Sequence, residues 1–321
     1  MKKNISAILL FAVILSAFSA CDRQGDGEHV ELILGTAGVG GGYYVAGAAL
    51  AEILTNVMPN VTITSIESPG AVGNPLLLGR GEIDLAVTNL ISAWSAFHGV
   101  GAYRDGGRIP LVGVVGLMTS ILHFMVAADS DIHSIADVRG RRISVGPTGG
   151  GGALIFDSMM PFLGITADDI TLYNFSHAEG ARRLIEGSID IVAMNVSVPT
   201  PVVTNLANAM DVRFLDIEEA FARQVLEGFP YYSFSAIAAG SYRGLTTPAH
   251  SLGMQDLLVV RSDMDDELAH QLALAIYESR DALGRMFPPL TEIAFEGFEH
   301  SLVRLHPGAL RFYRERGISL E

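Results

Sequence analysis

Two glycine-rich loops contain the residues with the clearest potential to bind a ligand. Gly38–Gly42 (GVGGG) and Gly149–Gly152 (GGGG) each follow a strand-like segment and precede a helix-like one. Glycine allows backbone N–H groups to approach an anion closely, and the start of a helix adds positive potential. Neither loop nor its immediate flanks contain Lys or Arg. We therefore expect backbone amides, with the hydroxyls of Thr36 and Thr148, to hold the carboxylate of a small ligand.

Further candidate side chains lie near these loops and at the ends of later strands. Tyr43 and Tyr44 could form an aromatic wall beside a short carbon skeleton, or one of them could pack within its helix. Asn74 could offer an amide to the ligand or cap a helix, and His123 could meet the ligand or be an ordinary interior histidine. The predicted ligand-binding residues are Thr36, Ala37, Gly38, Tyr43, Tyr44, Gly70, Asn74, Thr88, Asn89, His123, Thr148, Gly149, Gly150, Gly151 and Asn195.

Other charged residues are better explained by structure than by chemistry. Arg139, Arg141 and Arg142 could in principle clamp a carboxylate, but they precede a strand, which favours a solvated turn. Asp84 and Asp190 stand at strand starts, away from the carboxyl edge where ligands bind, so we assign them structural roles. No catalytic residue is predicted, and the protein is not expected to be an enzyme.

Alternating strand-like and helix-like segments would position these residues, as in layered α/β proteins. An amphipathic helix is indicated where Leu50, Ile53, Leu54 and Val57 share one face. Further helical faces include Phe156, Met159, Met160 and Leu163, and later Leu268, Leu272 and Ile276. Strands are predicted at 31–35, 61–67, 83–88, 111–117 and 143–145.

The order of strand, glycine loop, helix and second strand occurs twice. Gly81–Asn89 (GEIDLAVTN) matches Gly187–Asn195 (GSIDIVAMN) without a gap, and each follows one of the glycine loops. Two similar α/β lobes explain this repeat economically. Because open α/β sheets bind ligands at the carboxyl ends of their strands, both loops, Asn89 and Asn195 are expected on the walls of a cleft between the lobes.

The N-terminus has the pattern of an export signal. Lys2 and Lys3 precede an uncharged apolar run at 5–20, which is short for a membrane span of ~20 residues. Phe18–Cys21 (FSAC) resembles a lipobox, with Phe where Leu is usual, and Asp22 resembles an inner-membrane retention signal. We predict a signal peptide at 1–20, lipid attachment at Cys21, a polar tether at 21–28, and a periplasmic protein held at the inner membrane by its lipid. Simple secretion is the alternative.

Composition excludes several classes of protein. The 321 residues carry a formal charge of -14 and no basic patch, so no nucleic-acid partner is expected. A single cysteine excludes a disulfide scaffold and cysteine-ligated metal sites, and the histidines show no metal spacing. We expect no cofactor and no metal, and a monomer.

Five motifs in order resemble those of TAXI solute-binding proteins, the extracytoplasmic receptors of one class of TRAP transporter. They are 36–44 (TAGVGGGYY), 69–74 (PGAVGN), 131–145 (DIHSIADVRGRRISV), 239–242 (AGSY) and 306–309 (HPGA, with Phe312 and Tyr313). The resemblance covers residues 31–317, nearly all of the chain after the export signal. Ala71, Gly150 and Gly152 depart from it, because the family often has hydroxyl residues at these positions.

This resemblance implies an α/β, type II periplasmic-binding-protein fold. Lobe one would comprise 29–128 and 246–321, lobe two 129–245, and the strands 121–128 and 256–261 would cross at the hinge. The resemblance also implies capture of a small organic acid or amino acid, such as glutamate, glutamine, 2-oxoglutarate or another dicarboxylate. Delivery would be to the membrane subunits of an ion-coupled TRAP permease.

Two alternatives have different partners or chemistry. A binding protein for an ABC importer or a sensor kinase would have the same fold and a similar site. A dinucleotide-dependent oxidoreductase is a distant alternative, for which the glycine loop and Glu67 at the end of the second strand superficially fit. The G-x-G-x-x-G fingerprint fails, however, because Tyr43 occupies its last position.

Overall fold

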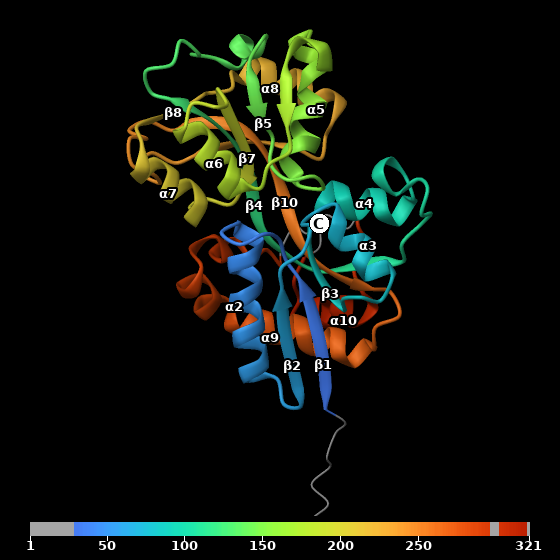
Figure 1. Cartoon of the computed structure of the whole chain (residues 1–321). Coiled ribbons are helices and arrows are strands. Elements are labelled where there is room, and N and C mark those ends of the chain that lie inside the picture. The colour runs from blue at the N-terminus through green and yellow to red at the C-terminus, as the bar shows by residue number, and fades with distance from the viewer. Residues whose placement is uncertain (1–28, 296–301, 320–321) are drawn as a thin grey trace, which may run out of the picture.

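Two α/β lobes make up the protein, one above the other in Figure 1. The computed structural model describes residues 29–295 and 302–319, so the expected signal peptide, Cys21 and tether lie outside the described residues. The strands are β1 (Val30–Gly35), β2 (Val61–Ile66), β3 (Leu85–Asn89), β4 (Leu111–Ala127), β5 (Arg142–Ser144), β6 (Thr171–Tyr173), β7 (Ile191–Val196), β8 (Val212–Phe214), β9 (Ser233–Ile237) and β10 (Ala249–Arg261). The helices are α2 (Gly42–Val57), α3 (Gly73–Gly79), α4 (Leu90–His98), α5 (Gly151–Leu163), α6 (His177–Ile185), α7 (Pro201–Ala209), α8 (Glu219–Gly228), α9 (Asp266–Met286) and α10 (Pro307–Glu315).

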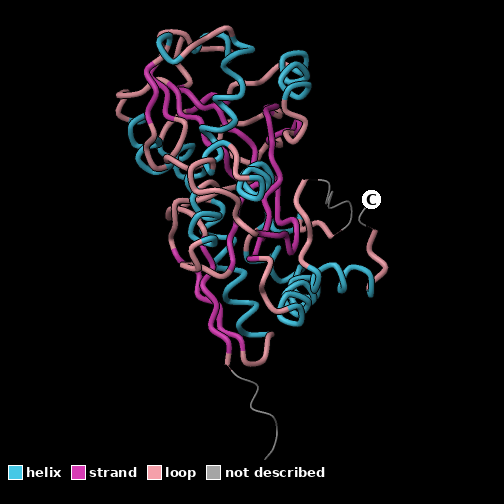
Figure 2. Tube along the Cα trace, turned by 90° about the vertical axis from the view of Figure 1, so that its right-hand side faces the viewer, coloured by secondary structure: helices cyan, strands magenta, loops and turns pink. Residues whose placement is uncertain are grey.

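The two longest strands, β4 and β10, run through both lobes. The strand order is β2-β1-β3-β10-β4-β7-β5-β6, with β8 beside β4 and β9 beside β10. In the first lobe β10 pairs with β3, and in the second lobe β10 pairs with β9 while β4 pairs with β7. Figure 2 shows strands passing from one lobe into the other. The lobes are therefore joined by continuous antiparallel strands.

The crossing differs in detail from the expectation. The crossing strands were expected at 121–128 and 256–261. Each of these segments is instead one part of a longer strand: the first belongs to the second-lobe part of β4, and the second is the first-lobe part of β10. Ile121 pairs with Val196 of β7 in the second lobe, whereas Asp256 pairs with Asn89 of β3 in the first. Apolar periodicity could not show this, because β4 is buried along nearly its whole length. The lobe boundaries at 128 and 245 stay a prediction.

The sequence repeat corresponds to a repeated structural unit. β3 pairs in parallel with β1, and β7 pairs in parallel with β5. Before each of these repeat strands an aspartate carboxylate accepts a backbone N–H from the neighbouring strand: Asp84 from Ile33 and Asp190 from Arg142, each at 2.8 Å. These two bonds fix the strand register, which agrees with the structural role expected for both carboxylates.

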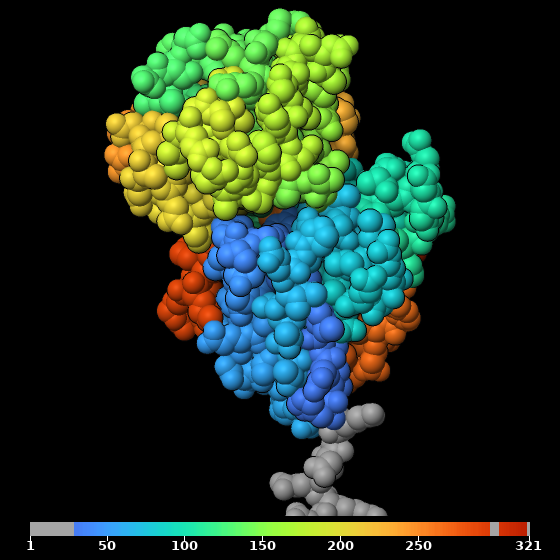
Figure 3. Space-filling model, in the orientation of Figure 1, coloured from blue at the N-terminus to red at the C-terminus, as the bar shows by residue number. Residues whose placement is uncertain are grey.

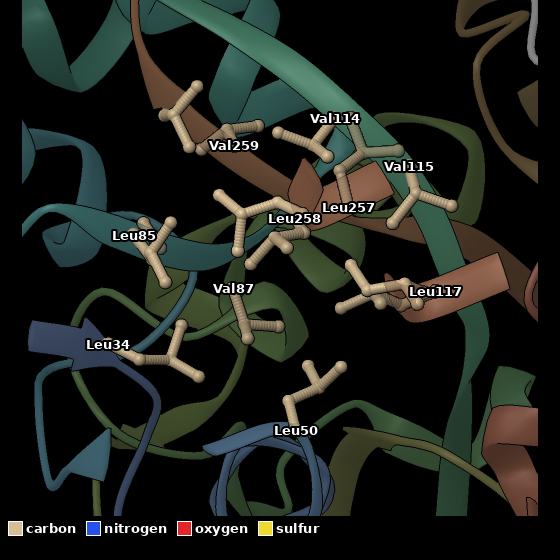
Figure 4. Close-up of a cluster of buried hydrophobic side chains, with 14 of the residues drawn as sticks. Leu34, Leu50, Leu85, Val87, Val114, Val115, Leu117, Leu257, Leu258 and Val259 are labelled. Atoms are coloured by element: carbon tan, nitrogen blue, oxygen red, sulfur yellow. The ribbon is translucent and has the colours of Figure 1, made fainter. Parts of the chain in front are cut away.

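Separate hydrophobic cores stabilise the two lobes. In the first lobe Leu34, Leu85 and Leu257 from the sheet pack with Leu50 of α2 (Figure 4). Burying one such side chain contributes about 1.5–3 kcal/mol relative to its exposed state. In the second lobe Phe124 and other residues of the sheet pack against α5 on one face, and a further cluster lies against α6 and α7. Because each lobe has its own core, the lobes can move relative to each other without unfolding.

Among the helices of the described residues, none combines the length and the apolar character needed to cross a membrane.

Candidate ligand-binding site

A cavity of about 360 Å³ lies where the two lobes meet. Figure 3 shows the crease between the lobes on one face of the molecule. Both lobes contribute to the walls, and Ser120 of β4 comes from the crossing. The lining residues are Ala37, Gly38, Val39, Gly41, Gly42, Tyr43, Glu67, Ser68, Pro69, Gly70, Ala71, Ser120, Pro147, Thr148, Gly150, Gly151, Ser176, His177, Ala178, Asn195 and Val196.

Three helices begin at the cavity wall. Helix α2 starts after Gly41, α5 starts after Gly150, and α6 starts after Ser176. All three N-cap residues line the cavity, and the first turns of α2 and α5 contain no acidic residue. The first N–H groups of a helix lack partners within the helix, and its dipole places partial positive charge there. The cavity is therefore built to favour an anionic group.

Few formal charges reach this wall. Among its lining residues, all in the described part of the chain, there is no Lys or Arg, and Glu67 is the only one with a carboxylate. Burial lowers the pKa of His177 to about 4, so its imidazole is neutral at neutral pH. Backbone dipoles and neutral donors are consequently the groups available to an anion, as the composition of the glycine loops predicts.

A buried carboxyl group supports the floor of the cavity. Asp256 of β10 accepts hydrogen bonds from the hydroxyls of Tyr43 and Ser120, and both of these residues line the cavity. Burial raises the pKa of Asp256 to about 8, and burial together with the neighbouring Asp256 raises the pKa of Tyr43 well above its usual value. The bonds connect the start of α2 to both crossing strands. They hold the Tyr43 ring as a wall of the cavity, with its hydroxyl directed to Asp256 rather than to a ligand.

The structure brings together eight of the fifteen predicted ligand-binding residues. Those that line the cavity are Ala37, Gly38, Tyr43, Gly70, Thr148, Gly150, Gly151 and Asn195. The side-chain Oδ1 of Asn195 is buried and has no hydrogen-bond partner among the described residues, so this atom remains available to a bound molecule or water.

Three predicted residues instead hold the loops in place. The Thr36 hydroxyl donates to the Ile66 carbonyl (2.7 Å), and the Thr88 hydroxyl donates to the Ala71 carbonyl (2.6 Å). The Asn74 side-chain amide donates to the carbonyls of Gly35, Thr36 and Val87. Because these groups are buried and already partnered, they shape the cavity from behind its wall. In this structure the Thr36 hydroxyl is not positioned to hold a carboxylate.

The other four lie outside the cavity for different reasons. Asn89 caps α4 through its bond from the Ser92 N–H (2.8 Å), and Tyr44 is about one-third exposed on the outer side of α2. His123 is fully buried, with Nδ1 2.7 Å from the Ile121 carbonyl, and burial lowers its pKa to about 4. Gly149 lies in the left-handed region (φ +82°), and its carbonyl accepts the Val72 N–H from the other lobe at 2.8 Å. That bond fastens the lobes together beside the cavity.

The sequence did not lead us to expect that α6 begins at the cavity, or that Ser120 and Asp256 are hydrogen-bonded at its floor. Ser176 followed three residues later by Glu179 is an N-cap signal, and it could have placed the start of α6 in advance. Ser120 and Asp256 follow Thr119 and Gln255 inside two long strands, and no local pattern shows that Ser120 faces a cavity or that Asp256 bonds to it. The same N-cap signal places His177 at the first position of α6, but its place in the cavity wall depends on the packing of the two lobes.

The arginine cluster lies apart from the cavity, as expected for a solvated turn. Arg141 pairs with Asp131 (2.8 Å), Arg142 with Asp190 (2.6 Å) and Arg139 with Asp169. None of the three arginines lines the cavity. Their charges are already matched by neighbouring carboxylates in the second lobe.

Two α/β lobes, continuous crossing strands and a cavity between the lobes define the type II periplasmic-binding-protein fold. The sequence profile of the NMT1-like family matches residues 34–317, so the chain belongs to this family. Among solved structures, the periplasmic aliphatic sulphonate binding protein SsuA from Escherichia coli superimposes with a TM-score of 0.51 at 16% identity, covering 90% of this chain and 88% of that one. XAC2383 from Xanthomonas citri, bound to chloride ion, gives a TM-score of 0.51 at 15% identity, covering 89% and 99%. These likenesses support the two-lobe fold.

Proposed function

We propose that the protein is an extracytoplasmic receptor that binds a small anionic solute between its lobes and delivers it to a membrane transporter. The observation that carries this proposal is the convergence of three helix N-termini, from both lobes, on one cavity lined by neither Lys nor Arg. Such an arrangement stabilises an anion only when both lobes are closed around it. No catalytic role is proposed, because both aspartates of the repeat are engaged in strand register.

The cavity suits a small organic acid, an amino acid or a sulphonate. Its volume of about 360 Å³ lies at the lower end of ordinary ligand pockets. A carboxylate and a sulphonate both present several oxygens to backbone N–H groups. SsuA is an aliphatic sulphonate binding protein and XAC2383 is bound to chloride, so anions occupy related folds.

A thermal-shift screen of carboxylates, amino acids and alkanesulphonates tests this function. A ligand that binds only the folded state at a hundred times its Kd stabilises it by about 2.7 kcal/mol, which raises the melting temperature. We expect at least one small anion to do so, and neutral sugars and organic cations to have no effect. Stabilisation by sugars or cations alone would contradict the proposal.

The transporter partner is a separate part of the proposal. The loop motifs resemble those of TAXI receptors for TRAP permeases, whereas the family match is to the NMT1-like family and the fold is similar to that of a sulphonate binding protein. These comparisons favour the alternative partner, an ABC importer, over a TRAP permease. Ligand uptake in vesicles containing the partner membrane subunits distinguishes the two. Uptake that requires ATP and resists collapse of the ion gradients supports the ABC importer, and the opposite result supports the TRAP permease.

A further inference from the structure

Glu67 gives the cavity a negative charge that anion binding does not explain. It follows β2 directly and is an exposed residue of the cavity wall. Its Oε1 would lie 3.6 Å from a Cβ atom built on Gly38, so the carboxylate stands beside the first glycine loop. Within the described part of the chain, its carboxylate has no hydrogen bond or ion pair.

A carboxylate in this place disfavours a ligand that carries only negative charge. Like charges at close range raise the free energy of binding, and no Lys or Arg of the lining compensates for Glu67. The chain as a whole has a formal charge of -14, so its wider field also repels anions. A dicarboxylate would be repelled both by Glu67 and by the net negative charge of the chain. A ligand with an additional cationic group would be repelled less by each.

We propose that Glu67 binds the ammonium group of a zwitterionic ligand, whose acidic group lies at the helix N-termini. This inference rests on the proposed function and narrows its substrate class to amino acids and aminosulphonates. Two ends of one cavity then have complementary chemistry: backbone N–H groups for the carboxylate or sulphonate, and a carboxylate for the ammonium. Glu67 is thereby assigned as the residue that selects for the amino group.

Matched pairs of ligands isolate the contribution of the amino group. The pairs are L-glutamate and glutarate, taurine and ethanesulphonate, and L-alanine and propionate, each titrated calorimetrically into wild type and Glu67→Gln. In the pair or pairs that bind, we expect wild type to prefer the amino member by about tenfold or more, as for a charge-assisted hydrogen bond. Glu67→Gln should reduce this preference to within about threefold.

Two further variants complete the design. Glu52→Gln changes the net charge equally at an exposed position of α2 that is not part of the cavity lining, and it should keep the wild-type preference. Glu67→Lys should reverse the preference, so that glutarate binds more tightly than glutamate. Because Glu67 is exposed, both variants at this position should fold, which thermal unfolding verifies.

Each result decides between the alternatives. Equal or tighter binding of the members without an amino group by wild type overturns the inference and leaves the proposed function intact. An undiminished amino preference in Glu67→Gln shows that another group binds the ammonium, which also overturns it. If wild type binds none of the six compounds, the inference is overturned, whereas the proposed function is contradicted only if no anion of the thermal-shift screen stabilises the protein either.

Discussion

Closure of the lobes depends on the absence of a side chain at Gly42. A Cβ atom at this position would lie 2.4 Å from Oγ of Ser197, which is fully buried just after β7 in the other lobe. A relaxed contact between such atoms needs roughly 3.5 Å. Gly42→Ala must therefore force Ser197 to rotate or keep the lobes apart by about 1 Å.

The expected effect on binding follows from that overlap. Forced rotamers and overpacking cost about 1–3 kcal/mol, which weakens the closed, ligand-bound state by about 5- to 150-fold. The open state is not affected, because the two residues belong to different lobes. Alanine also favours the helix more than glycine does, so the free energy of unfolding without ligand should stay constant or rise slightly.

Calorimetric titration and unfolding measurements on a double-mutant cycle test this prediction. Ser197→Ala removes the hydroxyl and leaves its Cβ at 3.4 Å from the introduced methyl group, so Gly42→Ala/Ser197→Ala should regain most of the affinity. Wild-type affinity in Gly42→Ala, or no recovery in the double variant, would refute the claim that these two residues meet when the lobes close.

Three other predictions concern the glycine loop before α5, the buried Asp256 below the cavity and lipid attachment at Cys21. Gly151→Val should weaken binding at least tenfold, because a Cβ there would lie 2.8 Å from Asn195 Nδ2, whereas Arg142→Gln should have little effect on binding; the reverse pattern in calorimetry would indicate an arginine clamp. The pKa of Asp256 is raised by burial from 3.8 to about 8, so the folded state holds a proton that the unfolded state has lost, and stability should fall as pH rises. Relative to Asp256→Asn, the wild type should lose about 1.6 kcal/mol of unfolding free energy between about pH 6.5 and 8, because the buried neutral His123 and His177 oppose the loss equally in both proteins. Equal pH slopes in the two proteins would assign the loss to other groups. Cys21→Ser should release an unlipidated protein from the membrane fraction, and mass spectrometry that finds an unmodified mature N-terminus in wild type would contradict lipid attachment.

Much of the architecture was predictable because local patterns and the repeat agree. The paired G-x-I-D segments indicated two α/β units, and the structure places Asp84 and Asp190 in equivalent hydrogen bonds to the neighbouring parallel strands. The crossing strands were harder to delimit. The strands β4 and β10 are buried through both lobes, and the polar pairs Thr119-Ser120 and Gln255-Asp256 that mark the passage between lobes could equally have indicated the end of a strand.

The glycine loops that bring backbone N–H groups to the candidate site were predictable from the sequence. The hydrogen-bond partners of most side chains near the site were not. Glycine runs before helices directly indicate where N–H groups can converge, and both loops do line the cavity. Thr36 and Thr88 were placed at the correct strand ends, but their hydroxyls bond to nearby loop carbonyls, a choice that depends on tertiary packing. Of Gly149, Gly150 and Gly151, only Gly149 has a positive φ, so it is the position whose backbone conformation favours glycine.

In the proposed complex, backbone N–H groups at three helix starts hold the acidic group of the ligand. A crystal structure of the protein with the compound that raises its melting temperature most tests this directly. We expect the carboxylate or sulphonate oxygens to lie about 2.7–3.2 Å from N–H groups at the starts of α2, α5 or α6, with the lobes closed as they are here. Density for the acidic group on Arg139, Arg141 or Arg142, or outside the cavity between the lobes, would contradict this binding mode.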